Sequence, residues 1–426
     1  MSRSTKLGPG GNSGHYNFNK YNGNNSIGAT SISNHNALKR LASFCKNNCN
    51  IPIDTNRTTL IYNTSQGNSF DWSEFTFVLN NSPPNYSYSA FVSAIPAITV
   101  PFRTNLINAT IGNVVTTIGT NAFSYCEALT SITIPNSVIS IGFNTFGNCR
   151  ALTSITIPNS VINIGAGAFG NCRALTSITI PNSVITIGTG AFIDNISLTS
   201  IIIPNSVINI SGNAFSGCSK LTSVTISNSL RAISNNTFNN CISLISITIP
   251  SSVITIGNNA FQGCSKLTSI SIPNSVITIG TSAFSNCTLL NYISIPNSLG
   301  AISNNTFNNC TSLTSIIIQN SVITIGTSAF NNCTSLISII IPNSVITIGT
   351  NAFQNCRALT SITIPNSVTT IGANAFNGCS SLIIVYISNE TAQNLGNWYS
   401  PSPSSIPIPP NNFYNAPRSI SFRLPQ

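Results

Sequence analysis

The chain has 426 residues, of which 42% are hydrophobic and only 5% are charged, a composition that suits a well-buried core and excludes a wholly disordered chain. Its net charge of +10 is spread thinly along the sequence, so we expect no nucleic-acid partner. No uncharged apolar stretch reaches the roughly 18 residues that a membrane span needs, and no secretory signal follows Arg3 and Lys6. We therefore expect a cytoplasmic location by default, with a surface or particle-associated location by another route left open.

The N-terminal flank divides into two parts. Residues 1–34 are rich in Asn, Gly and Ser, which predicts a disordered tail. Residues 35–104 predict a small α+β cap domain that covers the end of the repeat array behind it. Apolar spacing and β-branched runs predict its elements, a helix over 35–46 and strands over 58–63, 75–80 and 89–95. Cys45 and Cys49, near His35, lack the further ligands of a zinc site, so we predict no metal there.

Residues 105–391 contain about a dozen copies of one 23-residue sequence repeat. A phenylalanine recurs at this interval from Phe123 to Phe376, always three residues before a cysteine position. Eleven cysteines run from Cys126 to Cys379, and the column is interrupted only by Asn195. A single 23-residue repeat is too short to cover its own apolar face, so the period predicts a solenoid of stacked coils.

The copy "LTSITIPNSVINIGAGAFGNCRA", residues 152–174, shows what each coil should contain. The alternation over 152–157 predicts a strand that Pro158 ends, and 161–164 predicts a second, shorter strand. Gly165 provides a turn, and "AFGNC" predicts a helical turn that buries Ala168, Phe169 and Cys172. A dozen such coils, about 4.8 Å apart, make a rod or shallow arc of roughly 55–60 Å.

The pattern L-x-x-I-x-I-P-x-S-V-x-x-I-G-x-x-A-F-x-x-C closely resembles the BspA-like class of leucine-rich repeats. This resemblance implies a horseshoe-like β-rich solenoid with a parallel sheet on its concave face and no catalytic residues. It also implies kinship with surface adhesins of bacteria and protists. Serine replaces the turn glycine at Ser211, Ser234 and Ser303, and the strand-ending proline is replaced at Ser227, Gln319 and Ser388.

Two near-identical segments, 229–241 and 298–310, lie three periods apart and indicate that a three-coil block was duplicated. Behind the array, residues 392–426 include "SPSPSSIPIPP", which predicts an extended, proline-rich C-terminal tail.

The cysteine column has two interpretations. The thiols are either inert core residues or reactive groups that form disulfides. Stacked coils bring thiols near disulfide distance, but free cysteine also packs as a small buried hydrophobe, and we predict a reduced, buried ladder. The array contains no histidine, so it offers no ligand set for a metal. The whole chain has two histidines and six scattered acidic residues, too few for assembled acid–base catalysis. We predict a protein that is not an enzyme and needs no cofactor.

Two surfaces remain as binding candidates. Serine and threonine dominate the outward positions of the first strand, and large apolar residues replace them at Ile202, Tyr292, Ile317, Ile340, Ile384 and Tyr386. We interpret these six as ligand-binding residues of the concave face, although a hydroxyl column can also simply satisfy a solvated sheet. Basic residues just after the cysteine position, such as Arg150, Arg173 and Arg357, are expected to keep a low-charge rod soluble.

A second apolar column follows the inward valine of each coil. Its members, which we call the isoleucine stripe, are Ile139, Ile162, Ile185, Ile208, Ile254, Ile277, Ile323 and Ile346. If they point outward they form an assembly surface, and if the segment turns they are buried.

These features lead to two function hypotheses. The first is a non-enzymatic binding scaffold for protein or glycan ligands, adhesion-like if it reaches a surface. The alternative is a structural protein that assembles with copies of itself, or with a larger shell, through the isoleucine stripe. A hydroxyl array that orders water or ice is a weaker third idea, because Ile202, Tyr292 and Ile317 interrupt the array.

Overall fold

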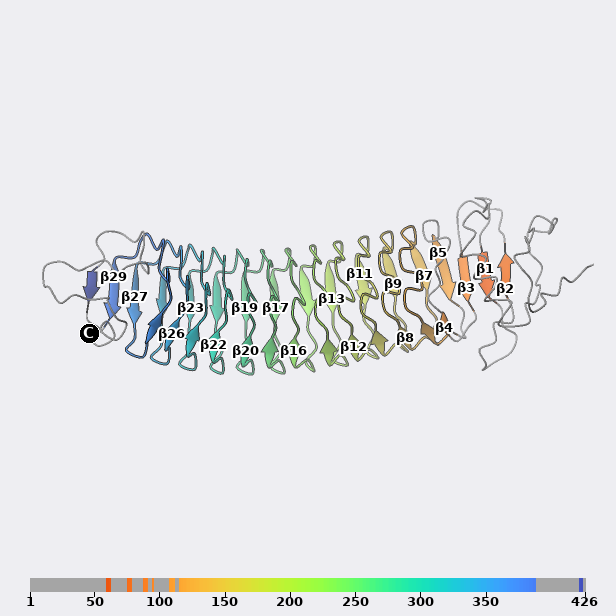
Figure 1. The fold of residues 1–426 in the computed structure, drawn as a ribbon. Coiled ribbons are helices and arrows are strands. Elements are labelled where there is room, and N and C mark those ends of the chain that lie inside the picture. The colour runs from red at the N-terminus through yellow and green to blue at the C-terminus, as the bar shows by residue number, and fades with distance from the viewer. Residues whose placement is uncertain are drawn as a thin grey trace, which may run out of the picture.

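The computed structural model describes residues 107–111 and 115–387, together with the backbone of strands between residues 59 and 95 and at 421–423. The 23-residue coils stack in one direction to form a long rod that bows only slightly (Figure 1). This architecture confirms the predicted solenoid, although the rod is straighter than a horseshoe. The predicted N-terminal tail and helix, and most of the C-terminal tail, lie outside the described residues.

Each coil contributes a first strand to a parallel ladder in which residues 23 apart in sequence are paired, such as Ile155 with Ile178. These strands match the predicted first strand but are shorter at both ends. They are β5 (Asn108–Ile111), β7 (Ser131–Thr133), β9 (Ser154–Thr156), β11 (Ser177–Thr179), β13 (Ser200–Ile202), β15 (Ser223–Thr225), β17 (Ser246–Thr248), β19 (Ser269–Ser271), β21 (Tyr292–Ser294), β23 (Ser315–Ile317), β25 (Ser338–Ile340), β27 (Ser361–Ile364) and β29 (Ile384–Ile387).

A second, two-residue strand follows in each coil and forms its own parallel ladder along the lower edge of the rod in Figure 1. These strands are β6 (Thr117–Ile118), β8 (Ser140–Ile141), β10 (Asn163–Ile164), β12 (Thr186–Ile187), β14 (Asn209–Ile210), β16 (Ala232–Ile233), β18 (Thr255–Ile256), β20 (Thr278–Ile279), β22 (Ala301–Ile302), β24 (Thr324–Ile325), β26 (Thr347–Ile348) and β28 (Thr370–Ile371). This ladder is broken between β14 and β16 and again between β20 and β22.

Strands also form in the flanks. Those before the array lie near the positions predicted from the sequence, whereas the strand behind it falls in the tail predicted to be extended. They are β1 (Thr59–Tyr62), β2 (Phe75–Val78), β3 (Ser87–Ala90) and β4 (Ala94–Ile95) before the array and β30 (Ser421–Arg423) behind it. The parallel pairs β3–β5 and β4–β6 continue both ladders toward the N-terminus, and β30 extends the first ladder by pairing in parallel with β29. A separate cap domain over residues 35–104 stays a prediction.

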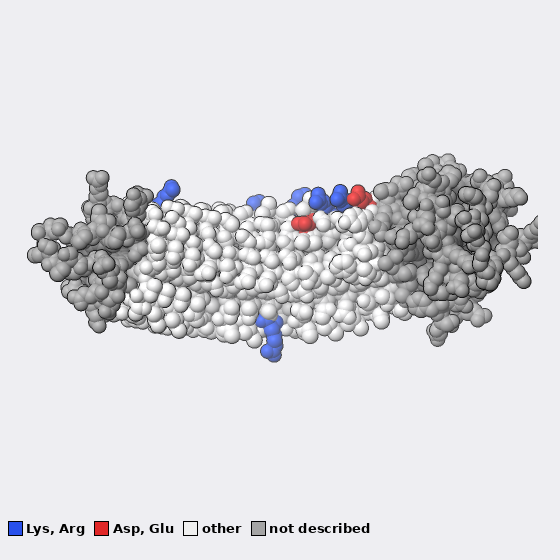
Figure 2. Space-filling model, in the orientation of Figure 1, with Lys and Arg blue, Asp and Glu red and all other residues white. Residues whose placement is uncertain are grey.

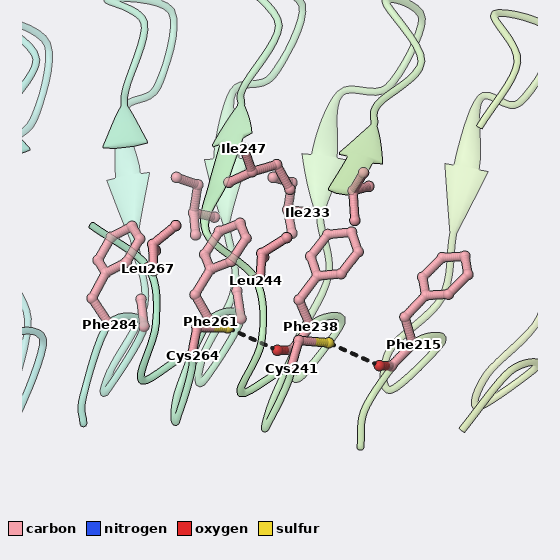
Figure 3. Close-up of a cluster of buried hydrophobic side chains, with 14 of the residues drawn as sticks. Phe215, Ile233, Phe238, Cys241, Leu244, Ile247, Phe261, Cys264, Leu267 and Phe284 are labelled. Atoms are coloured by element: carbon pink, nitrogen blue, oxygen red, sulfur yellow. Dashed lines mark hydrogen bonds between the residues drawn. The ribbon is translucent and has the colours of Figure 1, made fainter. Parts of the chain in front are cut away.

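The core of the rod is built from columns of identical residues. The phenylalanine rings from Phe123 to Phe376 stack along the axis, with centroids 5.2–5.7 Å apart and interplanar angles of 1–14°. Leucine, isoleucine, valine and cysteine columns fill the space around them, as Figure 3 shows for the coils near Phe238 and Phe261. The predicted burial of Ala168, Phe169 and Cys172 is confirmed.

The predicted helical turn at "AFGNC" is wrong. The segment is instead a run of consecutive turns, and no α-helix occurs in the described part of the array. The reason is that two residues in each coil adopt left-handed backbone conformations, as Gly167 (φ 61°) and Asn171 (φ 58°) do in one coil. Asparagine and glycine tolerate that region best, which explains why they dominate both positions along the array.

The turn glycine of each coil has a steric reason. A Cβ on Gly349 would lie 2.5 Å from the backbone nitrogen of Thr327 and 2.6 Å from the carbonyl carbon of Gly326, both in the preceding coil. At Gly349 the spacing of the coils therefore leaves no room for a side chain. Where serine stands instead, it hydrogen bonds to the neighbouring coil, as Ser303 Oγ does to the carbonyl of Ile279 at 2.5 Å.

Asn195 interrupts the cysteine column in the middle of the core. It is fully buried, and neither its Oδ1 nor its Nδ2 has a hydrogen-bond partner in the protein. In the next coil, Cys218 donates its thiol hydrogen to the carbonyl of Phe192, and a cysteine at 195 would have the equivalent Phe169 carbonyl as acceptor. Asn195 is therefore a local defect in an otherwise satisfied column.

We expect Asn195→Cys to stabilise the protein by about 1–3 kcal/mol, because it removes an unsatisfied buried amide. Urea unfolding under reducing conditions measures the change. Asn159→Cys, at an exposed asparagine, is the control and should alter the free energy of unfolding by no more than about 0.5 kcal/mol. A destabilised Asn195→Cys variant would contradict this account of the column.

Candidate functional site

The outer face of the first ladder consists mostly of serine and threonine side chains. In β9, for example, Ser154 and Thr156 are exposed while Ile155 points into the core. Threonines just before the strands donate their hydroxyl hydrogens to backbone carbonyls of the preceding coil, as Thr222 does to Thr199 at 3.0 Å. Most of this face is therefore polar and hydrogen-bonded within the rod, so apolar replacements on it stand out.

The structure brings three of the six predicted ligand-binding residues together. Tyr292, Ile317 and Ile340 lie on the neighbouring strands β21, β23 and β25, and Ile317 is directly paired with Ile340. All three are exposed, Ile340 most of all at 78%. Tyr292 is paired with Ser315 and lies diagonal to Ile317, within reach of a long side chain, so the three residues form one apolar group across three coils.

The other three predicted residues lie apart from that group. Ile202 is 68% exposed, but it stands alone on β13, and β15, β17 and β19 separate it from β21. Ile384 and Tyr386 share β29 and are half-buried, with β27 between them and Ile340. These residues do not contribute to a single site with Tyr292.

One member of the surface was missed from the sequence. Ile337, just before β25, is 54% exposed and belongs to the same coil as Ile340. It stands where most repeats have a threonine after their first leucine, and isoleucine also occurs at this position at Ile245 and Ile383. We call Tyr292, Ile317, Ile337 and Ile340 the apolar patch.

The isoleucine stripe lies beside the second ladder. Seven of its eight members are 41–58% exposed, and Ile254 is half-buried. Backbone hydrogen bonds join successive members, as from Ile162 N to the carbonyl of Ile139 at 3.0 Å and from Ile346 N to that of Ile323 at 2.8 Å. The stripe is not continuous, because Arg231 and Gly300 occupy the corresponding positions of their coils.

Charge is sparse on the rod and confined to its edges. The described residues of the array include six basic and two acidic side chains. Figure 2 shows most of them along one edge, with a single basic group on the opposite edge. Arg150 and Glu127 of neighbouring coils approach to 3.7 Å, but both are solvent-exposed, so this pair adds little stability.

The cysteine column is buried, free of disulfides and hydrogen-bonded. From Cys149 onward, each thiol donates to a phenylalanine carbonyl of an earlier coil at 3.1–3.2 Å. Figure 3 shows two of these bonds, from Cys241 and Cys264. Burial raises the pKa of Cys172 and Cys264 to about 12, so both are neutral thiols at physiological pH. Such thiols are poor nucleophiles and poor metal ligands.

Apart from this column, the described residues form no cluster of reactive or metal-binding side chains. No group of three or more His, Cys, Asp or Glu side chains gathers among them. A cavity lined by Ile210, Leu230 and Phe238 has a volume of about 10 Å³, which is room for roughly one water molecule. Binding by this part of the chain therefore depends on its outer faces.

The geometry defines a class, a parallel β-solenoid of 23-residue leucine-rich repeats. Residues 102–211, 186–314 and 300–411 match the "BspA type Leucine rich repeat region". The chain belongs to the BspA-type leucine-rich repeat family, as the sequence pattern of the repeat predicted. Within the residues that the structure describes, no apolar helix is long enough to cross a membrane.

The chain is also similar to solved structures of other leucine-rich repeat proteins. A leucine-rich repeat protein from Bacteroides ovatus is similar at 29% identity and a TM-score of 0.63, with 87% of this chain and 92% of that one covered. A leucine-rich cell surface protein from Faecalibacterium prausnitzii shows 27% identity and a TM-score of 0.48, over 80% and 90% of the two chains. No curated protein sequence matches the chain.

Proposed function

We propose that this protein is a non-enzymatic binding scaffold whose apolar patch recognises a protein ligand. The observation that carries the proposal is the patch itself, four large exposed side chains gathered on three coils of a face that is mostly serine and threonine. Solitary exposed isoleucines need no explanation, but a contiguous group with a polar surround has the composition of an interface centre.

The chemistry of the patch favours a protein over a glycan. Sugars bind through stacking on aromatic rings and through dense polar contacts, and the patch has one aromatic ring, Tyr292, among three isoleucines. Aliphatic side chains instead pack against aliphatic and aromatic side chains of another protein. The Tyr292 hydroxyl can form a hydrogen bond at the rim while its ring is buried, as aromatic residues at interface centres do.

The rigidity of the rod supports the same function. The strands β21, β23 and β25 are paired in one ladder and the phenylalanines of their coils are stacked, so the patch is presented without a loop that must be ordered on binding. A preorganised surface loses little conformational entropy when its ligand binds. The family assignment agrees with a scaffold role, because leucine-rich repeats present extended surfaces to partners.

A two-step experiment tests the proposal. Proteins retained by the wild-type chain are compared with those retained by Tyr292→Ser/Ile317→Thr/Ile340→Thr, and each differing partner is then purified and titrated calorimetrically against both chains. We expect at least about a tenfold loss of affinity for the triple variant and a negative heat-capacity change for the wild type. Ile202→Thr, which removes an equally exposed but isolated isoleucine, is the matched control and should bind normally. A partner that binds all three chains equally would refute the assignment of the patch.

A further inference from the structure

We propose that the isoleucine stripe is the contact surface for a second copy of this chain, packed antiparallel so that Arg231 of each copy lies over Gly300 of the other. The stripe belongs to the second ladder, so this inference is independent of the proposed ligand-binding patch. The stripe is interrupted at two places, Arg231 and Gly300.

The interruptions fall at related positions. Segments 229–241 and 298–310 are identical except at one residue, which is Arg231 in the first and Gly300 in the second. Both are exposed. The second ladder is also broken just before each of them, between β14 and β16 and between β20 and β22. One coil therefore carries the longest side chain of the stripe position, and the other carries none.

Gly300 leaves an open space in the surface. A Cβ placed on it would meet no atom within 4 Å, and its backbone conformation is one that any residue adopts. The following residue, Ala301, is also small and exposed. Nothing in the chain's own packing requires glycine there, in contrast with turn glycines such as Gly349. The missing side chain creates a gap between Ile277 and Ile323.

A two-fold axis between the coils of Ile254 and Ile277 relates the two interruptions. It places Ile254 opposite Ile277, Ile208 opposite Ile323 and Ile185 opposite Ile346 of the second copy, because each pair is equally distant from the axis in 23-residue steps. The same operation sets both Arg231 side chains over both Gly300 gaps. This is an isologous contact, which closes and does not propagate into a filament.

Other arrangements of the two copies fit less well. A parallel pair in register would set Arg231 against Arg231 across an apolar contact, which places like charges together. A parallel pair shifted by three coils would fill one gap and leave an unmatched end, which promotes open polymers. The antiparallel register alone fills both gaps and buries no like-charged pair.

The surroundings of the stripe suit a contact of modest strength. Thr278 and Thr324 flank the Gly300 gap and offer hydroxyl acceptors to the incoming guanidinium. Arg231 is the single charged residue in the columns from 136 to 143 and their equivalents through 373. The two-fold axis matches the stripe from Ile185 to Ile346, which is about 34 Å long. With flanking columns about 10 Å wide, each copy buries about 340 Å², which is below the size of stable specific interfaces and in the range of weak, transient contacts. We therefore expect a weak dimer that forms only at high protein concentration.

Sedimentation velocity of the full chain over a concentration series tests this contact. Gly300→Arg should weaken the dimer about tenfold or more, since it sets arginine against arginine, while the swap Arg231→Gly/Gly300→Arg should restore wild-type association. Thr179→Arg adds the same charge to the outer face of the first ladder and is the control, with no expected effect. A wild-type chain that stays monomeric at all concentrations, or a swap that fails to restore association, would overturn the proposal.

Cysteine cross-linking tests the orientation. The background is Cys45→Ser/Cys49→Ser, because the eleven array cysteines are buried and these two lie outside the described residues. Ile208→Cys combined with Ile323→Cys should give covalently linked dimers on mild oxidation, whereas Ile208→Cys alone should not. Efficient linkage by Ile208→Cys alone would mean that the copies are parallel, and the antiparallel register would be wrong.

Discussion

Alkaline solution is expected to unfold the repeat array, because its cysteine column must stay protonated to remain buried. Burial raises the pKa of Cys218, Cys310 and Cys379 to about 12. For the fully enclosed Cys241 and Cys287 the pKa is raised well above its ordinary value, first by burial and then by neighbouring thiols of the column. A thiolate inside the rod would have neither water nor a cation nearby.

The sign of the effect follows from the difference between the folded and unfolded thiols. In the unfolded chain a cysteine loses its proton near pH 8.5, whereas in the folded chain Cys218 keeps its proton to about pH 12 because burial raises its pKa. Stability from this source is therefore complete below about pH 8.5 and falls as the pH rises toward 12. Each thiol lowers the free energy of unfolding by about 1.4 kcal/mol per pH unit in that window. With about ten such thiols the total rivals the whole stability of an ordinary domain.

Chemical unfolding at a series of pH values, with reductant present, measures this slope. Replacing Cys241, Cys264 and Cys287 by alanine removes three titrating groups, so we expect the slope between about pH 9 and pH 10 to fall by about 4 kcal/mol per pH unit. The triple variant is less stable at neutral pH but should lose stability more slowly on the alkaline side. A wild-type protein equally stable at both pH values would show that the thiols are accessible to water.

The sequence was most informative where one physical requirement recurs at every coil. The 23-residue interval, the buried phenylalanine and cysteine columns and the strand ended by Pro158 all follow from repetition, because a residue that must fit between identical neighbours is repeated with them. The fold and the family could be predicted from those columns alone. The outward Ser–Thr positions followed from the same alternation.

Prediction failed where the backbone leaves the regular conformations. The segment "AFGNC" has helix-compatible residues, but the left-handed residues at Gly167 and Asn171 end any helix before it forms. Ile139, just before β8, is exposed and Ser140 is half-buried, and the two lie between the buried Val138 and Ile141. Two successive outward residues break strict alternation, which is why exposure of the stripe could not be decided from the pattern. Ile337 was missed because it is equivalent to Thr153 and lies just before β25, where two successive outward residues break the alternation.

Phe261→Ala is expected to destabilise the protein by about 3–5 kcal/mol. The ring is fully buried and stacks between Phe238 at 5.6 Å and Phe284 at 5.5 Å, so its loss leaves a cavity that touches two neighbouring coils. Stability in a solenoid comes from contacts between adjacent coils, so a defect in the middle weakens two interfaces at once. The column cannot close the gap, because the backbone ladders fix the spacing of the coils.

Phe143→Ala is the matched control, since the same chemical change is made at a phenylalanine that is 53% exposed. We expect it to change the free energy of unfolding by no more than about 0.5 kcal/mol. Urea unfolding of both variants, followed by circular dichroism, gives the comparison. A loss below about 1 kcal/mol for Phe261→Ala would mean that the ring column contributes little to the core. A broadened transition would mean instead that the two halves of the rod unfold separately once the column is cut, because the coils are coupled only through their nearest neighbours.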